Sequence, residues 1–184
     1  MKITLRDMCY ISLMAVMIAV CSWISLPLGA VPITFQTFGA AAALTILGGR
    51  RGTLSIAVYV VLGLIGIPVF AGFKGGAAVL FGMTGGYIFG FLLMGLCYTL
   101  LTRFISDELP VRCAALGLGL LLCYAFGTIW FMVLYTRTKG QISVLSALGM
   151  CVFPFIIPDI IKLAVAVLLA RRVTPLIDRI PPSR

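Results

Sequence analysis

The sequence predicts an all-α integral membrane protein, a bundle of six transmembrane helices with both termini in the cytoplasm. Of the 184 residues, 62% are hydrophobic and only 10% are charged, and the mean hydropathy of +1.19 lies far above that of a soluble domain. The apolar residues fall into runs, several of about the ~20 residues that a helix needs to cross hydrocarbon. Because six spans use nearly the whole chain, residues 1–184 are expected to form a single transmembrane domain.

Breaks in the apolar pattern separate the spans. The first run begins at Met8 and continues to Leu28 without a small-residue cleavage site, so we interpret it as a retained span and expect the mature protein to start at Met1. The second and third runs are short, so their helices are expected to tilt little or to lie partly inside the bundle. The expected spans are residues 8–28, 34–48, 53–68, 84–102, 113–135 and 148–170.

Lysine and arginine orient the chain, because loops rich in these residues stay in the cytoplasm. Lys162 lies within a span, and three of the 14 basic residues fall in external connections: Lys74, Arg137 and Lys139. The other ten fall on the cytoplasmic side: Lys2, Arg6, Arg50, Arg51, Arg103, Arg112, Arg171, Arg172, Arg179 and Arg184. This asymmetry favours an even number of spans.

Two external connections are unlike ordinary solvated loops. "GAVPITFQTFGAA" and "GIPVFAGFKGGAAVLFGMTGGYIFGF" are rich in Gly, Pro and aromatic residues and nearly uncharged. Irregular backbone within a membrane protein is tolerated where protein buries it or where it lines a cavity. We therefore expect both segments to form a lid over a ligand site. The alternative is a compact plug that only closes the outer end of the bundle.

The last span carries the most informative residues, Asp159 and Lys162. Residues three apart in a helix lie about 60° apart around its axis, so both share one face, which also holds Phe155 and Ala166. An ionisable group at mid-span costs ~3 kcal/mol or more and usually marks a functional site. Pro158 removes a backbone donor beside Asp159, so a kink is expected there. The alternative is a buried ion pair that only fixes helix packing.

An acceptor and a donor held this close suit a small neutral group with adjacent N–H and C=O groups. A ureide or a cyclic amide would donate to the carboxylate and accept from the ammonium. This chemistry defines a ligand class without naming a compound.

Four motifs occur in a specific order: "PITFQT", "LGLIGIPVF", "TGGY" and "PDIIK". Over residues 10–170 the sequence resembles the BioY family, the biotin-specific substrate-binding (S) components of energy-coupling factor (ECF) transporters. The resemblance implies capture of external biotin, without a cofactor. It also implies assembly with a transmembrane coupling protein and a pair of ATPases in a bacterial plasma membrane. "GMTGG" departs from the family, which often has proline at the position of Met83.

The resemblance also implies roles for single residues. Asp159 and Lys162 would hold the ureido ring of biotin, Thr34 and Gln36 would lie in the lid, and Tyr87 would cover the ligand. For Gln36 and Tyr87, local capping and interfacial anchoring are the alternatives. S components also carry small residues on the first helix for docking on the coupling protein. Here the candidates are Ala15 and Ala19.

Other classes of protein fit the sequence poorly. There is no histidine and no Walker A motif, and only one of the five acidic residues, Asp159, lies within a span, which leaves no carboxylate dyad, so we expect no enzyme. Scattered single cysteines predict no metal site, and the basic residues form no patch for nucleic acid. The partner of most of the surface is expected to be the lipid bilayer. Three alternatives stay open: an S component for another small vitamin, an ion-coupled carrier that uses Asp159, and a structural subunit without a ligand.

Overall fold

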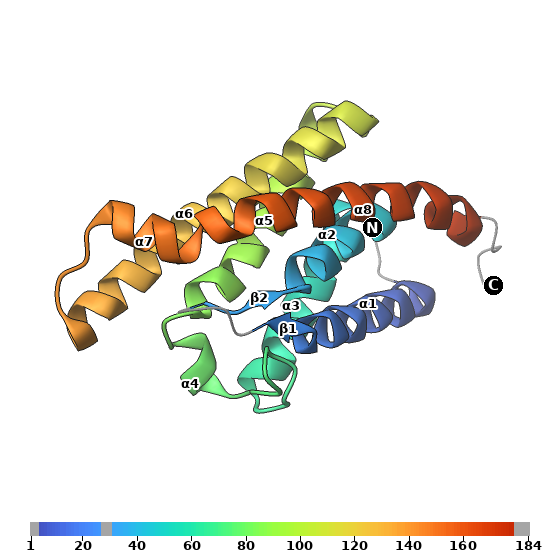
Figure 1. Ribbon diagram of the computed structural model, residues 1–184. Coiled ribbons are helices and arrows are strands. Elements are labelled where there is room, and N and C mark those ends of the chain that lie inside the picture. Colours follow the sequence, from blue (N-terminus) through green and yellow to red (C-terminus); the bar gives the residue numbers. More distant parts are fainter. Residues whose placement is uncertain (1–3, 27–30, 179–184) are drawn as a thin grey trace.

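The protein is a bundle of helices with a small hairpin at one end (Figure 1). The computed structural model describes residues 4–26 and 31–178, so the expected end of the first span at Leu28 lies outside the described residues. The elements are α1 (Leu5–Trp23), β1 (Ser25–Leu26), β2 (Ile33–Thr34), α2 (Gln36–Leu47), α3 (Gly49–Leu64), α4 (Ala77–Leu80), α5 (Gly85–Phe104), α6 (Leu109–Lys139), α7 (Val144–Cys151) and α8 (Phe153–Asp178).

Four helices, α1, α5, α6 and α8, are long and apolar enough to cross a membrane. Two more lie between them in sequence: α2 has 12 residues and α3 has 16 residues. At 1.5 Å per residue α2 is only about 18 Å long, well short of the hydrocarbon thickness. The chain is therefore a membrane protein in which helices of unequal length pack together.

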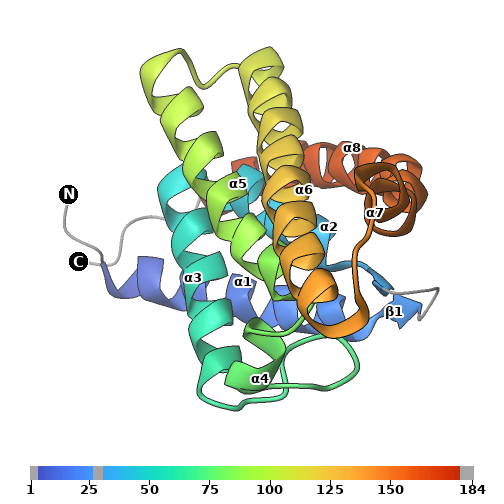
Figure 2. The same cartoon turned by 90° about the vertical axis from the view of Figure 1, so that its left-hand side faces the viewer.

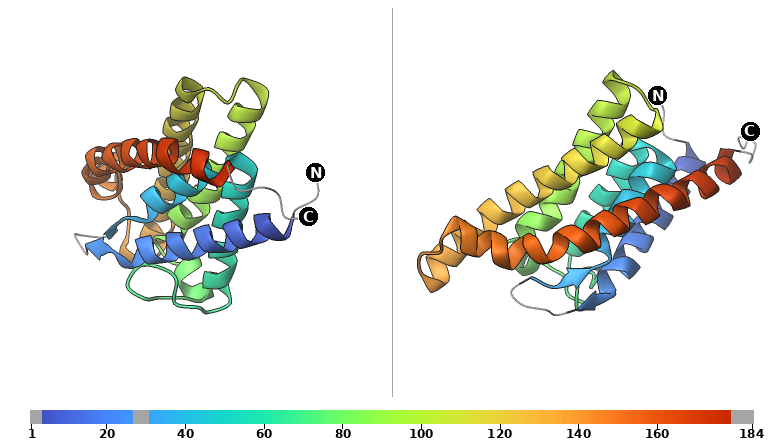
Figure 3. Two further views of the ribbon diagram at one scale, coloured as in Figure 1. Left: turned by 90° about the vertical axis from the view of Figure 1, so that its right-hand side faces the viewer. Right: turned by 45° about the horizontal axis from the view of Figure 1, so that its top comes forward.

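The short helix α2 lies at the centre of the bundle. All of its residues except Phe38 are buried, and α1, α3, α5 and α8 all pack against it. Its sequence explains this position, because small side chains let neighbouring backbones approach closely. A Cβ atom on Gly39 would lie 3.0 Å from the Cα atom of Ile18 on α1. Figures 2 and 3 show the longer helices arranged around this segment.

The two ends of the bundle differ in charge and structure. At one end α1 begins, α2 meets α3, α5 meets α6, and α8 ends (Figure 1). We call this the arginine end, because its basic residues are Arg6, Arg50, Arg51, Arg103, Arg112, Arg171 and Arg172. The opposite end, the hairpin end, holds the antiparallel pair β1 and β2 together with α4 and α7.

The connection between α3 and α4 folds back onto the hairpin end of the bundle. The indole Nε1 of Trp23 donates to the main-chain oxygen of Pro68 at 2.9 Å, and the Trp23 ring stacks on Phe73 with centroids 5.0 Å apart. The amide of Gly76 donates to the main-chain oxygen of Gly63 at 2.7 Å. These contacts fix the segment against α1 and α3 instead of leaving it in solvent.

Candidate functional site

The charged pair on α8 is buried and its two members contact each other. Asp159 is 2% exposed and Lys162 is 7% exposed. The Lys162 ammonium donates to Oδ1 of Asp159 at 2.8 Å. Helix α8 continues through Pro158, whose missing N–H leaves the main-chain oxygen of Pro154 without its usual partner within the helix. Pairing is the condition under which two charges tolerate such burial.

A second donor holds the carboxylate from the facing helix. The phenol of Tyr124, on α6, donates to Oδ2 of Asp159 at 2.6 Å. Each carboxylate oxygen therefore has one protein donor. Sequence reasoning missed Tyr124. The available signal was a tyrosine within an apolar span, since a buried phenol needs a hydrogen-bond partner.

The ammonium also joins α8 to the hairpin. Nζ of Lys162 donates to the main-chain oxygen of Thr34 on β2 at 2.7 Å, and it lies 5.8 Å from the ring centre of Phe35. Thr34 thus reaches the pair through its backbone. The Thr34 hydroxyl instead accepts from the main-chain N–H of Gln36 at 3.3 Å, at the start of α2. The hairpin and the charged pair are consequently one connected unit.

The pair keeps capacity for a further hydrogen-bonding group. An ammonium has three donors, and Lys162 uses two of them, on Asp159 and Thr34. An ionised carboxylate has about four acceptor positions, and Asp159 uses two of them. One donor and two acceptor positions remain at neighbouring atoms. This set matches a group that presents N–H and C=O side by side.

Gln36 and Tyr87, the other predicted polar residues, have protein partners of their own. The side-chain Nε2 of Gln36 donates to the phenol oxygen of Tyr59 at 2.8 Å. The hydroxyls of Tyr87 and Thr128 lie 3.1 Å apart and join α5 to α6. Both residues also line the cavity described below. Their roles in packing and in ligand contact are therefore compatible.

A cavity of about 430 Å³ lies at the hairpin end, within the usual size range of small-molecule sites. It brings together all five predicted ligand residues: Thr34, Gln36, Tyr87, Asp159 and Lys162. Apolar side chains from the helices form much of its wall, among them Ile88, Phe91, Leu120 and Phe155. Both connections singled out in the sequence contribute, through Val31, Pro32, Phe70, Ala71, Lys74, Ala78 and Val79. Both connections therefore form part of the cavity wall.

Lys74 is a second cation at this cavity that sequence reasoning did not assign. Its backbone is fixed by paired hydrogen bonds with Phe70, and its exposed side chain lies at the cavity wall. Within the described part of the chain its ammonium has no hydrogen-bond or ion-pair partner. The cavity therefore has two cations, Lys74 and Lys162, and one anion, Asp159. Its net positive charge suits a ligand with a negative group distant from its neutral polar end.

Ala15 and Ala19, the residues predicted to dock on the coupling protein, are both buried in this structure. Ala15 is 1% exposed and Ala19 is 4% exposed, and both belong to the core. The small side chains allow α1 to pack closely within the bundle. The exposed face of α1 instead carries Leu13, Val16 and Val20.

The fold and this cavity define a class: helical membrane proteins that bind a small molecule at one end of a bundle. The family can also be assigned. The model of the BioY family matches residues 1–179, and the chain belongs to that family.

Relatives and a solved structure agree with this assignment. The chain is 39% identical to the biotin transporter BioY of Thermotoga maritima over 173 residues, which cover 94% of this chain and 98% of that protein. It is 38% identical to the probable biotin transporter BioY of Pyrococcus horikoshii over 169 residues, or 91% of this chain and 95% of that protein. A crystal structure of the S-component for biotin from an ECF-type ABC transporter is also similar, with a TM-score of 0.80 and 28% identity. The match covers 91% of this chain and 90% of that chain.

Proposed function

We propose that this protein captures biotin and serves as the substrate-binding component of an ECF-type transporter. One observation carries the proposal. The buried Asp159–Lys162 pair keeps one donor and two acceptor positions at a cavity, in a chain whose relatives are biotin transporters. The ureido ring of biotin would donate N–H to Asp159 and accept from Lys162. The protein acts in transport and carries out no chemical conversion of its ligand.

The remaining cavity walls suit the rest of biotin. The apolar side chains of Phe91 and Phe155 offer contact for the fused rings, which carry no strong hydrogen-bonding group beyond the ureide. Tyr87 lies on the same wall and would cover the bicycle. The carboxylate tail is the negative group that Lys74 complements at the cavity wall. A monoanionic ligand thus balances the net charge of the site.

The proposed topology is six membrane-embedded helices, α1, α2, α3, α5, α6 and α8, with both termini in the cytoplasm. The arginine end then faces the cytoplasm, as the positive-inside rule requires, and the cavity faces outward. Helices α2 and α3 are too short to be assigned by length alone. Burial of α2 among its neighbours supports its place within the bundle. The proposed location is a bacterial plasma membrane, with the chain inserted as a multi-pass protein.

Transport needs partners, because the chain has no nucleotide-binding motif. The proposed partners are a transmembrane coupling protein and a pair of ATPases. Their ATP hydrolysis would supply the free energy for releasing biotin inward. The proposed docking face is the apolar surface of the bundle; Ala15 and Ala19, the candidates from the sequence, are buried in this structure.

The segments at the hairpin end form the proposed lid: residues 31–38 and 70–80. Closure over a ligand should increase their protection from solvent. Hydrogen exchange of both segments should therefore slow when biotin is added. Exchange that is the same with and without biotin would remove the lid from the proposal.

Calorimetry with biotin tests the ligand site. Asp159→Asn and Lys162→Met each remove one charge and should weaken binding by about tenfold to several hundredfold, because a buried partner is left unpaired. Glu108→Gln and Lys139→Met make matched changes at exposed positions away from the cavity and should leave affinity unchanged. Parent affinity in both site variants would overturn the assignment.

A further inference from the structure

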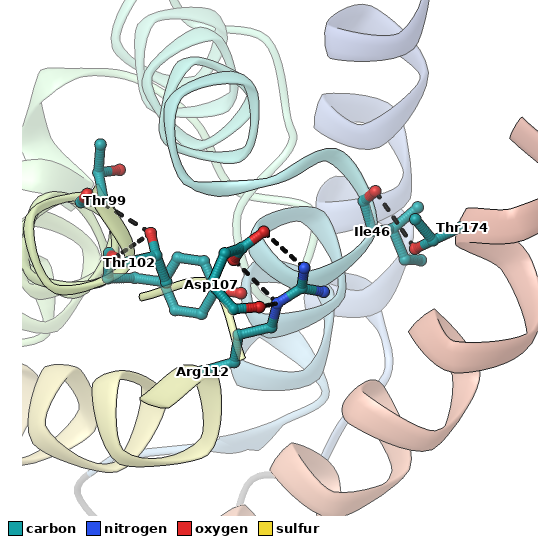
Figure 4. Close-up of polar contacts among 7 residues, drawn as sticks. Ile46, Thr99, Thr102, Asp107, Arg112 and Thr174 are labelled. Atoms are coloured by element: carbon teal, nitrogen blue, oxygen red, sulfur yellow. Dashed lines mark hydrogen bonds and ion pairs between the residues drawn. The ribbon is translucent and has the colours of Figure 1, made fainter. Parts of the chain in front are cut away.

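A second cavity, of about 300 Å³, lies at the arginine end, far from the proposed biotin site. It forms where the last turn of α2, the first turn of α6 and the last turns of α8 meet. Figure 4 shows this region, with Arg112 and Asp107 near the contact between Thr174 and Ile46. Nothing in the proposed capture of biotin uses these residues.

Two arginines from different helices line this cavity, Arg112 from α6 and Arg171 from α8. Asp107 holds the Arg112 guanidinium in place: Nε donates to Oδ1 at 2.9 Å and Nη2 donates to Oδ2 at 2.6 Å. Three of the five N–H donors of Arg112 remain available after these bonds. Arg171 is exposed and has no hydrogen bond or ion pair with any residue that the structure describes. One guanidinium is thus preoriented and the other is unpartnered.

The charge of this group matches one phosphodiester. Arg112 and Arg171 contribute two positive charges, and Asp107 offsets one of them. Glu108, next to Asp107 in the sequence, is exposed and does not line the cavity. Guanidinium groups recognise phosphate oxygens through paired hydrogen bonds better than ammonium groups do.

The other walls point to a lipid and not to a free ion. Leu109, Val167 and Ala170 are apolar, and the hydroxyls of Thr45 and Thr174 already donate to main-chain oxygens of α2. Leu168, next to Val167, is 61% exposed, as expected of a side chain that faces lipid. The cavity therefore lies where the apolar surface of α8 gives way to its terminal arginines, at the depth of lipid head groups.

We propose that this cavity binds the phosphate of an anionic phospholipid between α6 and α8. Arg112 and Arg171 hold the phosphate oxygens, and an acyl chain runs along Val167 and Leu109. Basic pockets between helices on the cytoplasmic side are suited to such head groups. In this chain the lipid would link the end of α8 to the α5–α6 pair, against which α8 packs only sparsely in the described residues.

Native mass spectrometry of delipidated protein in a neutral detergent tests the proposal. Phosphatidylglycerol and phosphatidylcholine with identical acyl chains are titrated separately, and inorganic phosphate is titrated alone. The proposal expects phosphatidylglycerol to bind about tenfold more tightly than phosphatidylcholine, and expects no retained phosphate. Equal binding of the two lipids would overturn the proposal. Retention of inorganic phosphate with no preference for phosphatidylglycerol would assign a free-phosphate site instead.

Variants test whether the lipid binds at this cavity or is only attracted by the positive charge of the protein. Arg171→Gln should reduce phosphatidylglycerol binding to the level of phosphatidylcholine, and Arg137→Gln, the same charge change at the other end of α6, should not. Equal losses in both variants would contradict the site. Val167→Phe fills the cavity without changing charge and should also lose the lipid preference. Biotin binding and the melting temperature check that each variant is folded, and exposed Arg171 provides the test even where Val167→Phe does not fold.

Discussion

Lys74 provides a sharp test of how the ligand lies in the cavity. If the tail carboxylate of biotin approaches this ammonium, then Lys74→Gln removes one charge attraction and leaves the ureido contacts at Asp159 and Lys162 intact. The substitution keeps a polar side chain of similar length. It also leaves the backbone hydrogen bonds between Phe70 and Lys74 in place.

The exposure of Lys74 sets the size of the effect. Two unit charges ~4 Å apart attract by about 1 kcal/mol in water and by about 4 kcal/mol at an effective dielectric constant of 20. Since the Lys74 side chain is exposed, the loss should lie near the lower value. We expect about a five- to tenfold weaker affinity for biotin, and a smaller difference at high salt because an exposed pair is screened.

The assay is calorimetry with two ligands, biotin and its primary amide, which lacks the negative charge. Lys74→Gln should weaken binding of biotin and change binding of the amide less than about twofold. Lys139→Gln removes an exposed lysine that does not line the cavity and serves as the control for net charge. An equal loss for both ligands would show that Lys74 acts on lid structure and not on the carboxylate, and would refute the reasoning.

Three further predictions follow from the packing. Tyr124→Phe removes the phenol donor to the site carboxylate, worth about 1.5–3 kcal/mol, so biotin affinity should fall by roughly ten- to a hundredfold in calorimetry; parent affinity would contradict this role. Gly63→Ala would place a Cβ atom 1.9 Å from Cζ of Phe70, so the buried Phe70 ring at the cavity wall must move, and both melting temperature and biotin affinity should fall. Ala15→Trp places a large side chain in the packed core, which should lower the free energy of unfolding by ~1–3 kcal/mol or more, so stability and biotin binding should fall together in detergent. If the variant keeps both its stability and its biotin binding, Ala15 does not lie in the core.

The charged pair could be predicted because hydrocarbon makes it costly. Any ionisable residue in an apolar span needs a partner, and helix geometry placed Asp159 and Lys162 on one face from sequence spacing alone. The unusual composition of the connections likewise indicated contact with a cavity. Both inferences use local sequence and one general cost. Neither requires knowledge of how the helices pack.

Contacts between distant segments could not be predicted in this way. Tyr124 reaches Asp159 across 35 residues of sequence, and nothing in the span around it marks which way its ring points. The first helix is apolar on all sides, so its sequence did not distinguish a core face from an exposed face. Ala15 and Ala19 belong to the core, on the helix whose Ile18 backbone comes close to Gly39 of α2.

The bonds of Lys162 suggest how binding and closure are linked. Its ammonium already donates to Thr34 of the hairpin and to Asp159 of the site, with a third donor unused. A ligand carbonyl can take that third donor without displacing the hairpin, so ligand binding and hairpin closure do not compete. Each new bond also restricts rotation of the same ammonium, which lowers the entropy cost of the others. Ligand at the pair should therefore hold the hairpin more firmly.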